Sequence, residues 1–161
     1  MLSVVWVVFS GLFLTAALID GRTYRIPNWV SLALVALFAV AVALSGKTIV
    51  DYWPNLALGA GMMVIGYGLY AATGMGAGDA KLAAAAVMWA GLGGLYAWVF
   101  ALAMSMAALA VTLVVLRRVA PAGQTEKRHV LQRGAPVPLG IALAAASVLA
   151  SWQFDAALWT F

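Results

Sequence analysis

An unbroken run of 35 residues without a charged side chain, from Leu82 to Leu116, constrains this chain more than any other feature. As one straight helix the run would be about 52 Å long, well beyond the roughly 30 Å hydrocarbon core of a bilayer. The sequence Gly91-Leu-Gly-Gly94 lies within the run and is typical of a break between two elements. The run therefore predicts a short helix near residues 80–91 and a longer one near residues 95–116.

Three more apolar segments precede this run and one follows it. They are Leu2–Ile19, Trp29–Leu44, about Trp53–Ala72 and about 137–153. A membrane-spanning helix needs about 20 mostly apolar residues. The sequence therefore predicts an all-α polytopic membrane protein with six transmembrane helices, the short fourth of which follows a glycine-rich turn. We expect a single transmembrane domain over residues 1–161.

The composition excludes most other classes of protein. Hydrophobic residues make up 66% of the chain and charged residues 9%, against about 45–50% and about 25% in soluble domains. We therefore attribute the net charge of +4 to basic loops beside a lipid bilayer, not to nucleic-acid binding. The chain has no cysteine and one histidine, His129 in a polar loop, so we expect no metal and no other cofactor. Any chemistry then falls to the carboxylates.

The positive charges predict the orientation of the six helices. Loops 1–2, 3–4 and 5–6 would share one side of the membrane. These loops contain Arg22, Arg25, Lys81, Arg117, Arg118, Lys127, Arg128 and Arg133. The opposite side would hold only Lys47. Because cytoplasmic loops carry the excess of Lys and Arg, we expect these three loops to be cytoplasmic and both termini to be periplasmic.

Two of the five acidic residues are candidates for a functional site. Asp51 and Asp155 fall in segments predicted to lie outside, and Glu126 lies among basic residues. Asp20 and Asp79 instead lie at the cytoplasmic ends of apolar segments, where an ionisable side chain is costly and suggests function. The structural alternative is that each acid marks a helix end that faces water.

The sequence around Asp79 favours the functional interpretation. Asp79 follows Gly74-Met-Gly76-Ala-Gly78, and these glycines allow unusual backbone conformations and close approach of another chain. We interpret the segment as an active-site loop beside a wet cavity, with a helix N-cap at Asp79 as the structural alternative. Two nearby carboxylates tend to share one proton, so one can accept a proton from water while the other donates to a carbonyl.

Two segments resemble motifs of the type IV prepilin peptidases. The segment from Asp20 to Ile26-Pro27-Asn28 is similar to the family's Asp…Ile-Pro-Asn segment. Gly76-Ala-Gly78-Asp79-Ala-Lys81-Leu82 is similar to its Gly-x-Gly-Asp-x-Lys-Leu segment. Val137-Pro-Leu-Gly140 is a weaker match to the short proline-containing segment that opens the family's last helix.

The resemblance implies a membrane aspartyl protease with Asp20 and Asp79 as its catalytic pair. Such enzymes remove the short basic leader from prepilins or pseudopilins at the cytoplasmic face of the bacterial inner membrane. Gly76, Gly78 and Lys81 would support the active-site loop, although Lys81 could equally bind headgroups or extend to the interface. Asn28 could hydrogen-bond near Asp20 or serve only in helix capping or solvation.

The chain also resembles one particular form of this family. Larger members carry an extra cytoplasmic segment with cysteine pairs, and some also methylate the new N-terminus. This cysteine-free chain is similar to the minimal form associated with Tad/Flp-type pili, so the resemblance implies cleavage without methylation. The sequence indicates neither the particular prepilin substrate nor the oligomeric state.

Two functions of other classes remain as alternatives. A small transporter or proton-coupled channel could use the two acids as a proton relay, but such acids are expected nearer the middle of the membrane. A non-catalytic membrane subunit of a pilus or secretion machine would not need both acids. A cleavage assay with the purified protein distinguishes the three functions.

Overall fold

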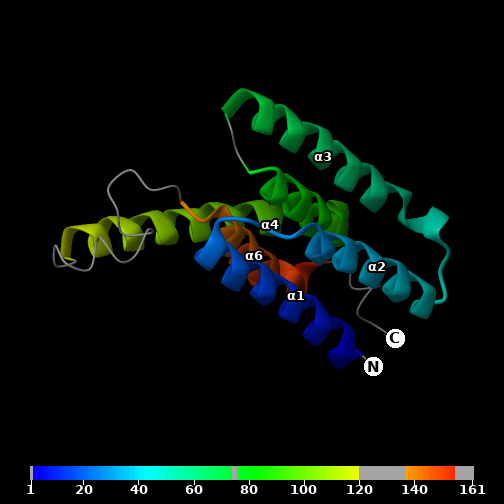
Figure 1. Ribbon diagram of the computed structural model, residues 1–161. Helices are drawn as coiled ribbons and strands as arrows, with labels where there is room; N and C mark the ends of the chain where they lie inside the picture. Colours follow the sequence, from blue (N-terminus) through cyan, green and yellow to red (C-terminus); the bar gives the residue numbers. More distant parts are fainter. Residues whose placement is uncertain (1, 74–75, 120–136, 155–161) are drawn as a thin grey trace.

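The computed structural model describes residues 2–73, 76–119 and 137–154, and all regular structure within these ranges is helical. The five α-helices are α1 (Leu2–Thr23), α2 (Asn28–Leu44), α3 (Trp53–Thr73), α4 (Ala77–Val119) and α6 (Leu139–Ala150). Two short 3₁₀ helices, η1 (Ile49–Tyr52) and η3 (Ser151–Gln153), precede α3 and follow α6. The prediction of an all-α fold is confirmed, and Figure 1 shows how the helices are arranged.

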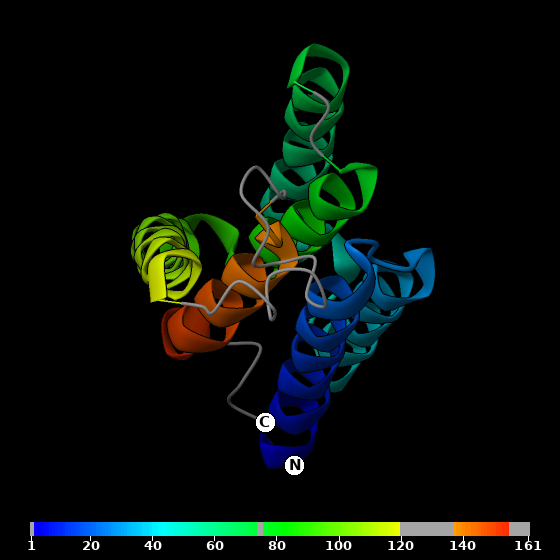
Figure 2. The same cartoon turned by 60° about the vertical axis from the view of Figure 1, so that its left-hand side comes forward.

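Helix α4 contains the break predicted in the long uncharged run. Gly91 has φ 58° and ψ −173°, a combination that belongs to glycine almost alone. A Cβ at this position would lie 2.7 Å from Nδ2 of Asn55, so space as well as conformation requires glycine. The two segments, residues 77–90 and 92–119, run in different directions, and Figure 2 views the second nearly along its axis.

A buried amide compensates for the interrupted helix at this break. A carbonyl just before a helix end has no amide partner one turn later. Here the Nδ2 group of Asn55 donates to the Met88 carbonyl at 3.0 Å, and the Asn55 residue is only 6% exposed. This hydrogen bond ties α3 to the last turn of α4 before the break.

The first segment of α4 forms the centre of the molecule. Every residue from Leu82 to Gly91 is buried, including the four alanines of positions 83–86. Helix α3 packs closely on one side of this segment, because Cβ atoms at Gly59 and Gly66 would lie 3.0 Å from the Met88 Cβ and 2.6 Å from the Ala80 Cβ. Gly59 and Gly66 therefore serve helix packing, whereas a Cβ at Gly61 or Gly68 would meet no atom within 4 Å.

An aromatic cluster fills the core beyond the alanine segment. Its members are Phe9, Phe13, Phe38, Trp89 and Phe154, each at most 1% exposed. The ring centroid of Phe9 lies 4.8 Å from that of Phe13, 5.0 Å from that of Trp89 and 5.9 Å from that of Phe154. The Trp89 indole also donates to the Leu34 carbonyl at 3.0 Å, which ties α4 to α2.

Three helical stretches of the described residues are long and apolar enough to cross a membrane. They are Val4–Thr23, Ile49–Thr73 and Ala77–Val119. Helices α2 and α6 are apolar but shorter, with 17 and 12 residues. The structure thus supports a membrane protein, and the count of six spans stays a prediction.

Two details of the predicted elements need comment. Helix α1 continues one turn beyond the expected end at Ile19, so Asp20 belongs to the helix and does not follow it. The helix ends where Tyr24 adopts a positive φ of 53°, with its amide bonded to the Asp20 carbonyl at 2.9 Å. The polar residues predicted in the loop after α4, including Glu126 and His129, lie outside the described residues.

Candidate active site

The structure brings both candidate acids to one cavity. A cavity of about 240 Å³ lies where the end of α1, the linker after it and the start of α4 meet. It is lined by Asp20, Tyr24, Arg25, Ile26, Gly76, Ala77, Gly78 and Asp79. Asp20 lies close enough for its charge to act on Asp79. Two acids that are far apart in the sequence therefore face one small polar space.

Asp20 is held by a third element. Asp20 is 4% exposed, and its Oδ2 atom accepts a hydrogen bond from the backbone N–H of Gly140 at 2.8 Å. Gly140 belongs to the first turn of α6, where unpaired amides and the helix dipole favour a negative group. A Cβ at Gly140 would lie 2.9 Å from both Cγ and Oδ2 of Asp20, so the contact depends on a glycine.

Asp79 is placed by the glycine-rich turn. It is the third residue of α4, which begins at Ala77, and its amide donates to the Gly76 carbonyl at 3.0 Å. The alternative prediction of Asp79 as the N-cap is therefore wrong, because the helix already starts two residues earlier. The Oδ1 atom of Asp79 is buried and has no hydrogen-bond partner within the described part of the chain.

The two glycines predicted in the active-site loop lie against the site. A Cβ at Gly76 would come within 2.7 Å of the Oδ2 atom of Asp79. A Cβ at Gly78 would lie 3.0 Å from both the Cβ and the carbonyl oxygen of Ile26. The absence of side chains thus lets the turn pack on the α1–α2 linker and leaves the Asp79 carboxyl its space.

Tyr24 adds a phenol to the same cavity. Burial raises the pKa of the Tyr24 hydroxyl, although the positive charge of Arg117 opposes this shift. The phenol therefore stays neutral. Its oxygen is buried and has no partner among the residues that the structure describes, so it is available to a ligand in the cavity.

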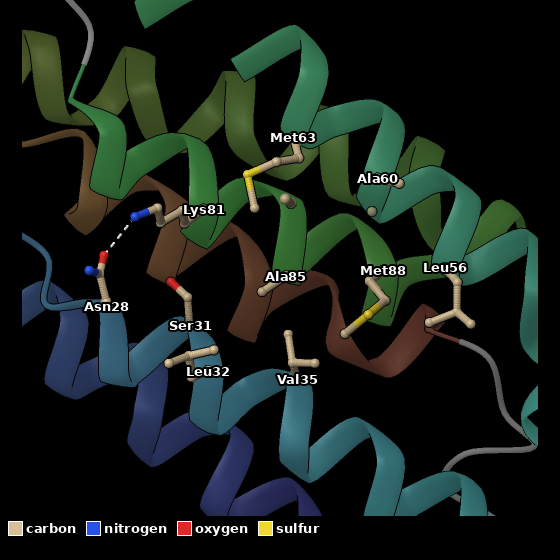
Figure 3. Close-up of a pocket in the computed structure, with 12 residues that line it drawn as sticks. Asn28, Ser31, Leu32, Val35, Leu56, Ala60, Met63, Lys81, Ala85 and Met88 are labelled. Carbon is tan, nitrogen blue, oxygen red and sulfur yellow. Dashed lines mark hydrogen bonds between the residues drawn. The ribbon is translucent and has the colours of Figure 1, made fainter. Parts of the chain in front are cut away.

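Lys81 and Asn28 lie beside the acids but line a different cavity. The Nζ atom of Lys81 donates to Oδ1 of Asn28 at 2.8 Å. Both residues are at one end of a larger cavity of about 480 Å³ between α2, α3 and α4 (Figure 3). The structure thus pairs these two predicted site residues with each other.

Sequence reasoning missed Gly140 and Tyr24 as parts of the site. Gly140 belongs to the short segment Val137-Pro-Leu-Gly140, which the sequence analysis connects with the start of the last helix only. Its amide could have been inferred as an acid partner, because a helix N-terminus attracts carboxylates. Tyr24 lies between the Asp20 and Ile-Pro-Asn motif residues and carries no signal of its own.

The fold and this site together define a class of protein: an all-helical membrane protein with two carboxylates at the end of its helix bundle. The family model of the type IV leader peptidases matches residues 7–114, which include both acids. The chain therefore belongs to the type IV leader peptidase family, and the predicted resemblance is confirmed. Neither the curated proteins nor the solved structures gave a match. Membership of this family implies a peptidase.

Proposed function

We propose that this protein is a membrane aspartyl endopeptidase that removes the short basic leader of prepilins or pseudopilins. Asp20 and Asp79 would be its catalytic residues. The observation that carries this proposal is the single cavity that both acids line, in a chain of the leader peptidase family. An aspartyl pair needs no cysteine or histidine nucleophile, which fits a chain without cysteine.

The two carboxyl groups differ in their surroundings, and the difference suggests their roles. Asp20 accepts the Gly140 amide, which favours its ionised form. Asp79 has an oxygen without a donor, which suits the protonated form. In the proposed first step, Asp20 takes a proton from water, the water oxygen bonds to the scissile carbonyl carbon, and Asp79 gives its proton to the carbonyl oxygen.

The second step reverses the direction of proton transfer. Asp20 gives its proton to the amide nitrogen, the carbon–nitrogen bond breaks, and Asp79 recovers a proton from one hydroxyl of the intermediate. The products are the leader with a new carboxyl group and the mature chain with a new amine. Both acids return to their starting states, so the cycle needs no other reactant than water.

We further propose that the site faces the cytoplasm from the bacterial inner membrane. Arg22 and Arg25 come shortly after Asp20 in the chain, and Lys81 comes shortly after Asp79. These basic residues therefore lie at the same end of the bundle as the two acids. Cytoplasmic loops are enriched in such residues. A basic leader in the cytoplasm would then reach the acids without crossing the membrane.

The experiment that tests this proposal compares Asp20→Asn and Asp79→Asn with the unchanged protein. Asparagine keeps the size and polarity of the side chain but cannot exchange the proton. We expect each variant to lower the rate of leader removal by at least about 10³-fold, measured with a leader-bearing pilin-type substrate in detergent or liposomes.

Asp51→Asn is the matched control, because Asp51 is exposed, lies in η1 before α3 and accepts hydrogen bonds only from Thr48 among the described residues. This variant should cleave like the unchanged protein. Substantial activity in Asp20→Asn or Asp79→Asn would remove that residue from the catalytic pair. An unchanged protein that accumulates in the membrane without cleaving any leader-bearing substrate would favour the non-catalytic alternative.

A further inference from the structure

The larger cavity continues from the acid site along the same two stretches of chain. On α4 the acid site ends at Asp79, and the cavity is lined from Lys81 to Met88. On the α1–α2 linker the acid site ends at Ile26, and α2 lines the larger cavity from Asn28 to Val35. We call this cavity the apolar groove; it lies between α2, α3 and α4, with Asn28 and Lys81 at one end (Figure 3).

The walls of the groove suit an apolar chain. Helix α3 supplies the third wall, and the small residues Ala60, Ala84 and Ala85 are among those that line the groove. Met63 and Met88 point toward this space in Figure 3, and methionine adapts its shape to what it contacts. No acidic residue is among those that line the groove.

The polar groups of the groove are gathered at the end nearest the acids. Lys81 and Asn28 lie there, bonded to each other, and one turn further Ser31 is 8% exposed with a hydroxyl that has no partner in the described ranges. The lysine ammonium repels a basic peptide segment. An extended peptide at the acids would therefore turn its basic part away from the groove and its apolar part into it.

We propose that the apolar groove binds the apolar helix of the substrate directly after the cleaved bond. This inference rests on the proposed function, because it places a leader-bearing substrate in the acid cavity. Asn28–Val35 and Lys81–Met88 each extend for about 10 Å, so the groove contacts about two turns of the bound helix. The groove thus sets which bond of the substrate reaches the acids.

The first test fills the groove from its α3 wall. Ala60 is exposed and lines the groove, so Ala60→Trp adds volume there without disturbing the core. Ala57→Trp is the matched control, because Ala57 is equally exposed on the same helix and does not line the groove. We expect Ala60→Trp to lower the cleavage rate at limiting substrate by at least about tenfold, and Ala57→Trp to leave it unchanged.

The substrate provides a second comparison. A soluble peptide that carries the leader and the cleavage site but lacks the apolar helix does not use the groove. Ala60→Trp should therefore cleave this peptide at the rate of the unchanged protein. A loss on both substrates would show a general disturbance of the acid site and would contradict the groove as a helix-binding site.

The absence of cysteine allows a direct measurement of the contact. Ala60→Cys is combined with Asp79→Asn, so that the uncleaved substrate stays bound, and one cysteine is placed in the first two turns of the substrate helix. Oxidation should link the two chains, whereas the same experiment with Ala57→Cys should not.

The two proposals fail in different ways. If the unchanged protein cleaves no leader-bearing substrate, the proposed function is wrong. If it cleaves, but Ala60→Trp and Ala57→Trp behave alike and Ala60→Cys gives no cross-link, the groove is covered by lipid and the inference is wrong.

Discussion

The Asp20 carboxylate shows how a single missing side chain can position a functional group. Its hydrogen-bond donor, Gly140, is 120 positions away in the sequence. The α6 backbone reaches the carboxylate only because Gly140 has no Cβ, which would also lie 2.8 Å from Cδ1 of Ile26. The position of Asp20 thus depends on close packing between the start of α6 and the end of α1.

We predict that Gly140→Ala lowers the cleavage rate strongly while the protein still folds. The alanine retains the backbone N–H, so the variant changes the position of the carboxylate and not its hydrogen-bond donor. A displacement of this kind can cost about 10²-fold in rate, measured as the initial rate of leader removal.

Gly93→Ala is the control, because a Cβ at Gly93 meets no atom within 4 Å. Equal rates in the two variants would mean that Asp20 tolerates displacement, and would weaken its assignment to the catalytic pair.

The sequence reveals the acids at this scale but not their neighbours. Asp20 and Asp79 stand out because charge is rare in apolar segments, and that signal is local. The Gly140 contact depends on how α6 packs on α1, which no local pattern encodes. Lys81 and Asn28 are likewise visible in the motifs, but their mutual hydrogen bond follows from the packing of α4 beside α2.

Helices α3 and α4 approach each other through glycine. The Cβ that Gly66 lacks would lie 2.6 Å from the Ala80 Cβ and 3.1 Å from its Cα. Ala80 directly follows Asp79, so the contact also fixes the start of the helix that carries this acid. Close packing of small residues is one of the contributions that hold helices together in a bilayer.

We predict opposite effects of alanine at two glycines of α3. Gly66→Ala pushes the two helices apart and should destabilise the protein by about 1–3 kcal/mol. Gly68→Ala meets no atom within 4 Å and should stabilise the helix by about 0.5–1 kcal/mol. The midpoints of thermal unfolding in detergent measure both effects. Equal shifts in the two variants would show that the Gly66 contact does not contribute to stability.

The elements were predictable where the signal was a change in composition. The glycines after Ala90 interrupt an apolar run that is too long for one span, and the break occurs at the first of them, Gly91. The sequence prediction ends α1 one turn too early, because the polar residues Asp20 and Arg22 indicate the end of an apolar segment. A helix can continue past the apolar boundary when tertiary contacts, here those of Asp20, hold its last turn.

The orientation of the whole molecule remains a prediction from its charges. The basic residues flank the acid end of the helices, whereas Lys47 lies at the end of the bundle where α2 leads into η1. We therefore expect a reporter fused after Lys47 to be periplasmic and one fused at Thr125 to be cytoplasmic. Enzymatic reporters that are active on one side of the membrane measure this. The reverse result would place the acids outside and would separate them from a cytoplasmic leader.

The aromatic cluster has a consequence for the passage of water and protons through the helix bundle. Phe13 on α1 and Trp89 on α4 lie about 10–15 Å along their helices from Asp20 and Asp79. A hydrolytic site must admit water from one side, and ionisable acids in a wet cavity could pass protons onward if water continued through the bundle. The tightly packed rings interrupt such a file of water molecules. If the proposed function holds, the protein would cleave its substrate without opening a path for protons through its helix bundle.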